Sequence, residues 1–135
     1  MKIGVVGAGQ VGATTALMMA QKELGDIVLI DIVEGMPQGK SLDMAEAAPV
    51  ELYDSKLSGS NEMCALEGAD VVVVTSGVPR KPGMSREDLL EVNAKIADSV
   101  GADIAKYAPD SMILMVANPL DVLCQIAFEA SGFPK

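Results

Sequence analysis

The chain has 135 residues, the size of one domain, and half of them are hydrophobic although only 3% are aromatic. Ten basic residues stand against 19 acidic ones, so the formal net charge is −9, which disfavours nucleic acid or an anionic membrane as a partner. No apolar run approaches the roughly 20 residues of a membrane span. Because the sequence starts directly with an expected strand and not with a targeting peptide, it predicts a cytoplasmic protein.

The N-terminal segment follows the order strand, glycine turn, helix, strand, acid. We expect a strand over 2–6, a helix over 10–23 that Gly25 ends, and a second strand over 27–31. The first turn reads Gly7-Ala8-Gly9-Gln10-Val11-Gly12, and the second strand ends on Asp31. A G-x-G-x-x-G spacing in this context, with an acid at the next strand end, is typical of a dinucleotide-binding unit.

Each of these residues has a physical reason to be there. Gly7 permits a tight turn, Gly9 lets a pyrophosphate approach the backbone, and Gly12 lets the helix pack close to the strand. The pyrophosphate then binds unpaired N–H groups at the positive end of the helix. The Asp31 carboxylate can accept both ribose hydroxyls and would repel a 2′-phosphate, so NAD is expected and not NADP. The alternative is a glycine-rich turn in another α/β domain, which leaves the acid unexplained.

The next elements continue the alternation of strand and helix. We expect a helix over 38–47, a weak strand over 56–58, a short helical connector over 61–68 and a strand over 69–75. The last of these contains four successive valines without polar alternation, which indicates that helices cover both faces of the sheet.

A loop rich in proline, glycine and cations follows, and Ser85 begins a long helix. Ser85 and Asp88 have the spacing of a capping box, and Pro109 closes the helix. A fifth strand is expected over 111–116 and a last helix over 120–130. The pattern predicts a three-layer doubly wound α/β fold, a Rossmann domain over 1–135, with a parallel sheet ordered 3-2-1-4-5 and the usual sixth strand absent.

The sulfur-containing and large apolar side chains are expected in the core. The cysteines have neither metal-ligand nor redox spacing and are interpreted as reduced, buried residues. Residues expected in the core or on the buried face of a helix are Val11, Leu17, Met18, Met19, Cys64, Met112, Met115 and Cys124.

Four motifs that together span the chain carry a family resemblance: GAGQVG, DIVEGMPQGKSLD, TSGVPRKPGMSREDLLEVNA and VANPLDV. The chain resembles the N-terminal, NAD-binding half of the lactate/malate dehydrogenase family, in particular its bacterial malate-oxidising members of lactate-dehydrogenase-like type. The resemblance implies an oxidoreductase of the tricarboxylic acid cycle that converts malate and NAD to oxaloacetate and NADH. It also implies a dicarboxylate substrate and a homo-oligomer with the helix over 38–47 at one interface.

The resemblance assigns roles to individual residues. Thr75, Ser76 and Gly77 would lie beside the nicotinamide, and Asn93 and the Val116-Ala117-Asn118 turn at its ribose. The implied cofactor-binding set is Gly7, Gly9, Gln10, Val11, Gly12, Asp31, Thr75, Ser76, Gly77, Asn93, Val116 and Asn118.

Three polar side chains are implied to bind substrate. Arg80 would pair with the distal carboxylate, where lactate enzymes typically have glutamine, because a guanidinium can hold a carboxylate bidentately. Arg86 would act in catalysis by polarising the substrate carbonyl, and Asn118 would orient the reacting oxygen. Without the surrounding motif, each arginine would be interpreted as a solvated loop cation, as Lys81 still is.

The chain contains no histidine. In the family, the proton-accepting histidine, its aspartate and a third arginine belong to the C-terminal catalytic domain, which we expect to be absent here. A histidine suits this proton transfer, so the chain alone is expected to bind NAD(H) without turnover. Two alternatives stay open: a stand-alone nucleotide-binding module, and half of a split enzyme that another chain completes.

Overall fold

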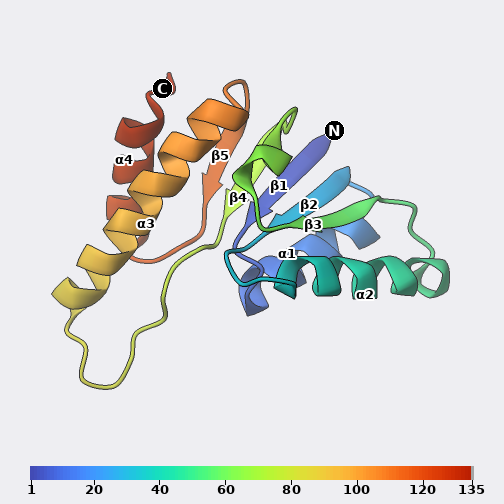
Figure 1. Cartoon of the computed structure of the whole chain (residues 1–135), viewed down its shortest axis with the longest axis horizontal. Coiled ribbons are helices and arrows are strands. Elements are labelled where there is room, and N and C mark those ends of the chain that lie inside the picture. The colour runs from blue at the N-terminus through green and yellow to red at the C-terminus, as the bar shows by residue number, and fades with distance from the viewer. Residues whose placement is uncertain (135) are drawn as a thin grey trace.

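A computed structural model, which describes residues 1–134, contains one parallel five-stranded sheet. The strand order β3-β2-β1-β4-β5 is the one that the sequence predicts, and Figure 1 shows the strands side by side. The strands are β1 (Lys2–Val6), β2 (Asp26–Ile30), β3 (Leu57–Ser60), β4 (Val71–Val74) and β5 (Met112–Met115).

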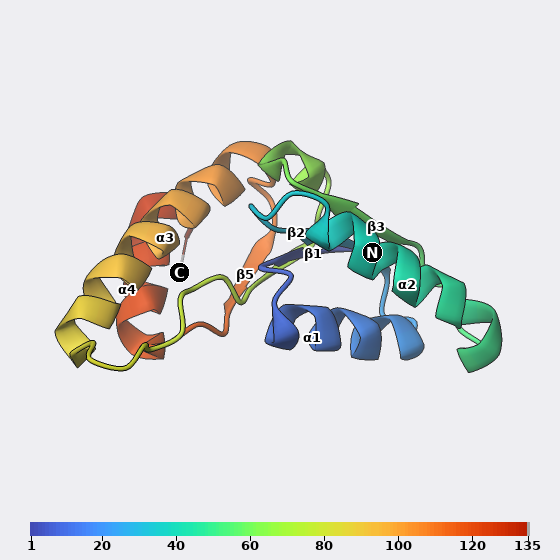
Figure 2. The same cartoon turned by 60° about the horizontal axis from the view of Figure 1, so that its bottom comes forward.

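The helices form two groups. Figure 2 shows α1 and α2 lying along one side of the molecule, and α3 and α4 paired with each other at its other end. A short 3-10 helix, η1, precedes β4 where a helical connector was expected. The bounds are α1 (Gln10–Gln21), α2 (Met36–Glu51), η1 (Met63–Leu66), α3 (Arg86–Tyr107) and α4 (Leu120–Ser131).

The central strands β1, β2 and β4 are buried on both faces, as the run of valines in β4 predicts. Val5 pairs in register with Leu29 and Val73, and these three side chains belong to the core beneath α1 and α2. The next row along the strands packs in the second core, on the face of α3 and η1, and consists of Val6, Ile30 and Val74. The alternation of side chains along each strand therefore supplies both cores at once.

Two helices differ from the prediction in where they begin or end. Helix α1 ends at Gln21 with Lys22 as its C-cap, so Gly25 lies outside it and belongs to the connection to β2. Helix α2 extends beyond 38–47 at both ends. Pro37 fits its first turn because an N–H at that position has no helical acceptor, and Leu52 ends the helix in a left-handed conformation.

Several large side chains expected in the core are exposed. The buried face of α1 carries Gly12, Ala16 and Ala20, which bring the helix close to the sheet and leave Val11 and Met18 facing outward. Met112 is also exposed, whereas Leu17, Met19 and Met115 pack against the cores. Both cysteines, Cys64 and Cys124, are free as expected but exposed, so burial was the wrong prediction for them.

Two kinds of feature are absent from residues 1–134. No helix in this range is long and apolar enough to cross a membrane. Within the same range, no group of three or more cysteine or acidic side chains is arranged to hold a metal ion.

Candidate functional site

A cleft of about 540 Å³ lies at the carboxyl ends of β1, β2 and β4. Strand β1 pairs with β2 on one side and β4 on the other, so the chain reverses its direction across the sheet at this point. Ligands of doubly wound sheets bind at such a switch point. Six of the predicted cofactor residues line the cleft: Gly7, Gly9, Asp31, Thr75, Ser76 and Gly77.

The three glycines of the turn have different surroundings. Gly7 has a φ of +104°, and a Cβ there would lie 2.7 Å from the Thr75 hydroxyl oxygen. A Cβ on Gly12 would overlap the Gly7 carbonyl oxygen, so these two glycines are required by the turn and by the packing of α1. A Cβ on Gly9 would have no atom within 4 Å. The open space at Gly9 is where a phosphate group can approach the backbone.

The N-terminus of α1 is open to an anion. Gly9 is its N-cap, no side chain caps the helix, and its first turn contains no acidic residue. The first N–H groups of a helix have no acceptor within the helix and carry the positive end of its dipole. Gln10 and Val11, the first two helical residues, are exposed beside this end and do not line the cleft.

Backbone donors hold the Asp31 carboxylate at the end of β2. One oxygen accepts from the Ala8 N–H at 2.7 Å, and the other accepts from the Val33 N–H at 3.0 Å. A carboxylate oxygen can accept more than one hydrogen bond, so both oxygens keep capacity for ligand hydroxyls. The acid is thus oriented before any ligand binds.

The residues after β4 close the opposite wall of the cleft. The Thr75 hydroxyl donates to the Gly7 carbonyl oxygen at 3.0 Å and joins the end of β4 to the glycine turn. The Ser76 hydroxyl is buried and has no hydrogen-bond partner among the described residues. Gly77 is exposed and packs beside Asn93.

Asn93 of α3 holds two loops and does not line the cleft. Its side chain is 3% exposed; Oδ1 accepts from the Val78 N–H at 2.8 Å, and Nδ2 donates to the Asn118 carbonyl oxygen at 2.9 Å. The Asn118–Pro119 peptide is cis, and Asn118 itself is exposed. Val116, which was expected at the nicotinamide ribose, is also exposed and outside the cleft.

Residues 78–85 form a loop that Figure 1 shows extending away from the sheet. Arg80 lies within it, and its Nε donates to the Met84 carbonyl oxygen at 3.1 Å. Arg86 is the first residue of α3. Both arginines are exposed and neither lines the cleft, so the structure does not place them among the cofactor residues that line it.

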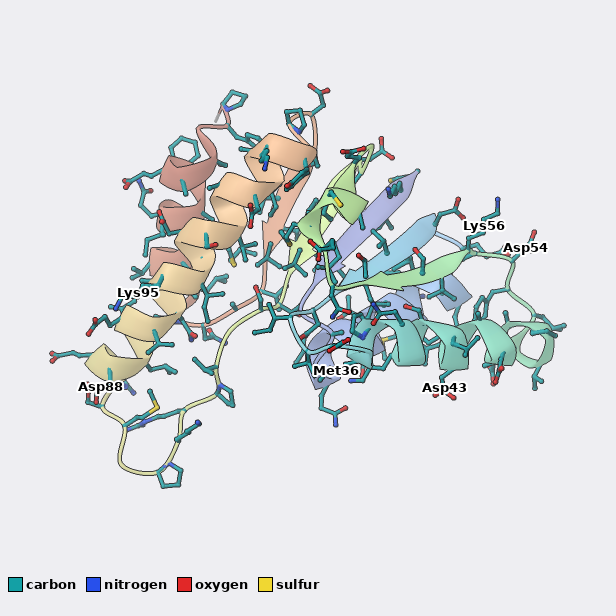
Figure 3. All side chains as sticks on the ribbon, viewed as in Figure 1. Met36, Asp43, Asp54, Lys56, Asp88 and Lys95 are labelled. Carbon is teal, nitrogen blue, oxygen red and sulfur yellow. The ribbon has the colours of Figure 1, made fainter. Side chains whose placement is uncertain are left out.

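The predicted capping box fixes the start of α3. The Asp88 N–H donates to the Ser85 hydroxyl at 3.0 Å, and the Ser85 N–H donates to the Asp88 carboxylate at 2.9 Å. The hydrogen bond from the Ser85 backbone, and after it that from the side chain, lowers the pKa of Asp88 below its usual 3.8. Figure 3 shows Asp88 where the loop meets the helix, two residues after Arg86.

Other cleft residues were not expected from the sequence. Ile32 and Val33 follow Asp31; Ile32 is 96% exposed, and the pair forms an apolar wall. The Asn61 Nδ2 donates to the carbonyl oxygens of Asp31 at 2.7 Å and Val33 at 2.9 Å. Two apolar residues directly after the acid are a signal that could have predicted the wall. Asn61 has no comparable signal because β3 reaches the site only through its pairing with β2.

The whole chain, residues 1–135, matches the family described as lactate/malate dehydrogenase, NAD binding domain. The chain belongs to the lactate/malate dehydrogenase family. Within this family, it corresponds to the domain that binds NAD. The match agrees with the fold, the glycine turn and the acid at the end of β2.

The chain is similar to malate dehydrogenases and to lactate dehydrogenases. That of Desulforudis audaxviator is 57% identical over 134 residues, which are 99% of this chain and 43% of the relative. The solved malate dehydrogenase of Picrophilus torridus, in its apo form, has a TM-score of 0.95 and is 46% identical. The match covers 98% of this chain and 43% of that protein. The lactate dehydrogenase of Cryptosporidium parvum, in complex with lactic acid and nicotinamide adenine dinucleotide, has a TM-score of 0.92 and 40% identity. This chain thus spans less than half the length of the relatives it matches, although each match covers at least 98% of it.

Proposed function

We propose that this chain is the cofactor domain of an NAD-dependent malate dehydrogenase. The observation that carries the proposal is the Asp31 carboxylate, which backbone donors hold beside the open N-terminus of α1. A carboxylate at this place accepts ribose hydroxyls and repels a 2′-phosphate. The malate dehydrogenase relatives support the choice of reaction, which is the oxidation of malate to oxaloacetate with reduction of NAD.

The geometry suits each part of the dinucleotide. The backbone N–H groups of Gln10 and Val11 would hold the pyrophosphate, and Asp31 the adenosine ribose. Ile32 would cover the adenine, with Ile96 and Val100 of α3 on the other side of the cleft. Thr75, Ser76 and Gly77 would contact the nicotinamide half. NAD, when bound, supplies the acceptor for the hydride that leaves malate.

The nicotinamide ribose site would be formed by the turn of Val116, Ala117 and Asn118, which Asn93 positions. In this conformation the Asn93 amide is bonded to both loops, so its contribution to the nicotinamide ribose site is to place the Asn118 turn. We propose that the backbone of this turn reaches the ribose. The exposed Asn118 side chain then orients the reacting oxygen of the substrate.

Arg80 and Arg86 suit a substrate that carries two carboxylates. Within residues 1–134, neither guanidinium has a carboxylate within ion-pair distance, so both are available to an anionic ligand. Arg80 would hold the distal carboxylate bidentately, and Arg86 would stabilise the charge that develops on the carbonyl oxygen. Both lie at the loop that follows β4, so we propose that this loop closes over the substrate and excludes water.

We further propose that the proton-transfer step is performed outside these residues. The chain has no histidine, and it covers 43% of its malate dehydrogenase relative, so the family's C-terminal catalytic domain would supply the general base. The alternatives remain a stand-alone nucleotide-binding module and one half of a split enzyme. Activity restored by adding a polypeptide with the second half would favour the split enzyme. We place the parent enzyme in the cytoplasm and in the tricarboxylic acid cycle, as a homo-oligomer that pairs through α2.

The test is a titration of the purified chain with NADH and, separately, NADPH, followed by fluorescence or calorimetry. We expect saturable binding of NADH and binding of NADPH that is at least about tenfold weaker, as expected for one unfavourable charge contact. Asp31→Asn should weaken NADH binding and narrow the difference between the two cofactors. Absence of NADH binding would contradict the proposal, as would a malate-dependent NADH rate from this chain alone.

A further inference from the structure

Two opposite charges hold the residue between the first two glycines of the turn. Ala8 is fully buried, and its N–H donates to the Asp31 carboxylate at 2.7 Å. From the other side, the Lys40 Nζ donates to the Ala8 carbonyl oxygen at 2.6 Å. Lys40 belongs to α2 and is half-buried, and nothing in the sequence motif or in the chemistry described above requires an ammonium at this place.

The two contacts fix two successive peptide planes. The Ala8 N–H belongs to the Gly7–Ala8 peptide and the Ala8 carbonyl to the Ala8–Gly9 peptide. A trans peptide is planar and its C=O and N–H point in opposite directions, so Lys40 also fixes where the Gly9 N–H points. Among the described residues the Gly9 N–H has no acceptor, and Gly9 is exposed at the open end of α1. A ligand can therefore use it.

A glycine on each side makes this restraint necessary. Glycine adopts more backbone conformations than any other residue, so the Ala8–Gly9 peptide could rotate without steric hindrance from a Cβ of Gly9. Rotation would change the direction in which the Gly9 N–H points. A charged donor on the carbonyl oxygen opposes that rotation and also polarises the peptide, which makes the N–H on its other end a stronger donor.

Lys40 makes no ion pair within the described residues. Within residues 1–134 the only carboxylate–ammonium pair within 4.0 Å joins Lys95 and Glu91, on α3. In a chain with a net charge of −9, a partly buried ammonium behind the glycine turn is a local source of positive potential for a diphosphate. It acts through the peptide and not by direct contact.

We propose that Lys40 is a positioning residue of the cofactor site, which orients the Ala8–Gly9 peptide toward the diphosphate of the dinucleotide. The inference rests on the proposed binding of NAD and names a residue of α2 that this binding needs. Lys40 thus connects α2 directly to the glycine turn, because its side chain bridges residues that are 32 positions apart in the sequence.

The test compares four chains: wild type, Lys40→Met, Lys40→Arg and Lys56→Met. Lys56 is a matched control because its loss changes the net charge equally, and it precedes the amino end of β3, away from the cleft (Figure 3). We expect Lys40→Met to raise the Kd for NADH and for ADP-ribose by the same factor, about tenfold or more, as for other hydrogen bonds to charged groups. Lys40→Arg should recover most of the affinity, and Lys56→Met should bind as wild type does.

A second measurement separates positioning from stability. We expect the NMR chemical shift of the Gly9 amide, which belongs to the peptide that Lys40 holds, to change in Lys40→Met and to stay at the wild-type value in Lys56→Met. If Lys40→Met does not fold, Lys40→Gln takes its place, with the same expectation. A lysine that only tethers α2 would lower the unfolding midpoint and leave the Kd for NADH unchanged, and that result would overturn the inference. If the wild-type chain fails to bind NADH, the proposed function fails instead.

Discussion

Gly9 and Gly12 are three residues apart in one turn, but their surroundings differ. Alanine at position 12 is expected to lower stability, whereas alanine at position 9 is expected to weaken cofactor binding. Gly12→Ala would force its Cβ against the Gly7 carbonyl oxygen, so we expect a loss of about 1–3 kcal/mol in the free energy of unfolding, as for other overpacked sites. Gly9→Ala has free space, so its stability should stay within about 0.5 kcal/mol of wild type. Its methyl group occupies the path of the phosphate, so NADH binding should weaken.

Chemical denaturation and NADH titration of both variants check this pair of expectations. Gly9→Ala is the better probe of the site because its backbone angles, φ −66° and ψ −165°, suit alanine. Unchanged NADH affinity in a folded Gly9→Ala chain would show that the diphosphate binds elsewhere.

Roles that follow from local spacing could be predicted, whereas the hydrogen-bond partners of residues that act across the fold could not. The roles of Gly7 and Gly12 in the turn follow from the order of strand, turn and helix. Lys40, Asn61 and Asn93 hold backbone atoms that are 32, 30 and 25 positions away, so only the folded chain shows their partners. The cofactor role of Asn93 stays a prediction, and the fold adds that its amide connects two loops.

At the scale of elements, the capping box makes the start of α3 sensitive to acid. The pKa of Asp88 is lowered in the folded chain, so its stabilising effect is complete above pH 3.8 and is lost as the pH falls through the lower, folded-state pKa. Below that pH the Ser85 N–H loses a charged acceptor, and we expect the first turn of α3 to fray. Arg86 lies in this turn, so its placement should become less defined.

An NMR titration of the Ser85 amide proton measures the midpoint of this change directly. The Asp88→Asn chain should show no such transition, because its neutral amide still accepts the hydrogen bond but does not titrate. Ser85→Ala removes the N-cap side chain and should lower the free energy of unfolding by about 1 kcal/mol at neutral pH. A Ser85 titration midpoint above 3.8 would contradict the assignment of the cap.

Element order and type could be predicted more reliably than element ends. Buried valines identify β4, and serine and aspartate three residues apart identify the start of α3. The end of α1 depends on where the chain turns toward β2, and α2 continues through residues 48–51 because Tyr53 packs in the core and its hydroxyl donates to the Met44 carbonyl oxygen. Such tertiary contacts override local glycine and proline signals.

At the scale of the whole molecule, one face of β5 is uncovered. Met112 is 68% exposed and Leu114 49% exposed, and Val116 continues the same side of the strand. Leu120 and Val122 of α4 are exposed as well. Contiguous apolar surface of this kind marks an interaction site. The five-strand order and an uncovered fifth strand were predictable from the alternation of strands and helices. The side chains that form the bare face were not, because they depend on α4 packing against α3.

We expect the chain to self-associate at high micromolar concentration. Leu114→Lys places a charge on the β5 face and should shift the molecular mass measured by light scattering toward the monomer. Val50→Lys on α2, where the side chain is 80% exposed, is the matched comparison for pairing through α2. The variant that dissociates the oligomer identifies the face. A wild-type chain that stays monomeric would contradict both possibilities.

Both ends of the loop over 78–85 are hydrogen-bonded to the same helix, α3. The Val78 N–H donates to the Asn93 side chain, and the Ser85 N–H donates to the Asp88 carboxylate. The stretch between these anchors can therefore gain or lose residues without displacing the scaffold. Arg80 lies between the two anchors, whereas Arg86 lies on the helix. An insertion or deletion there changes the position of the proposed carboxylate selector alone, so new substrate preferences can evolve while the proposed carbonyl-polarising group keeps its place.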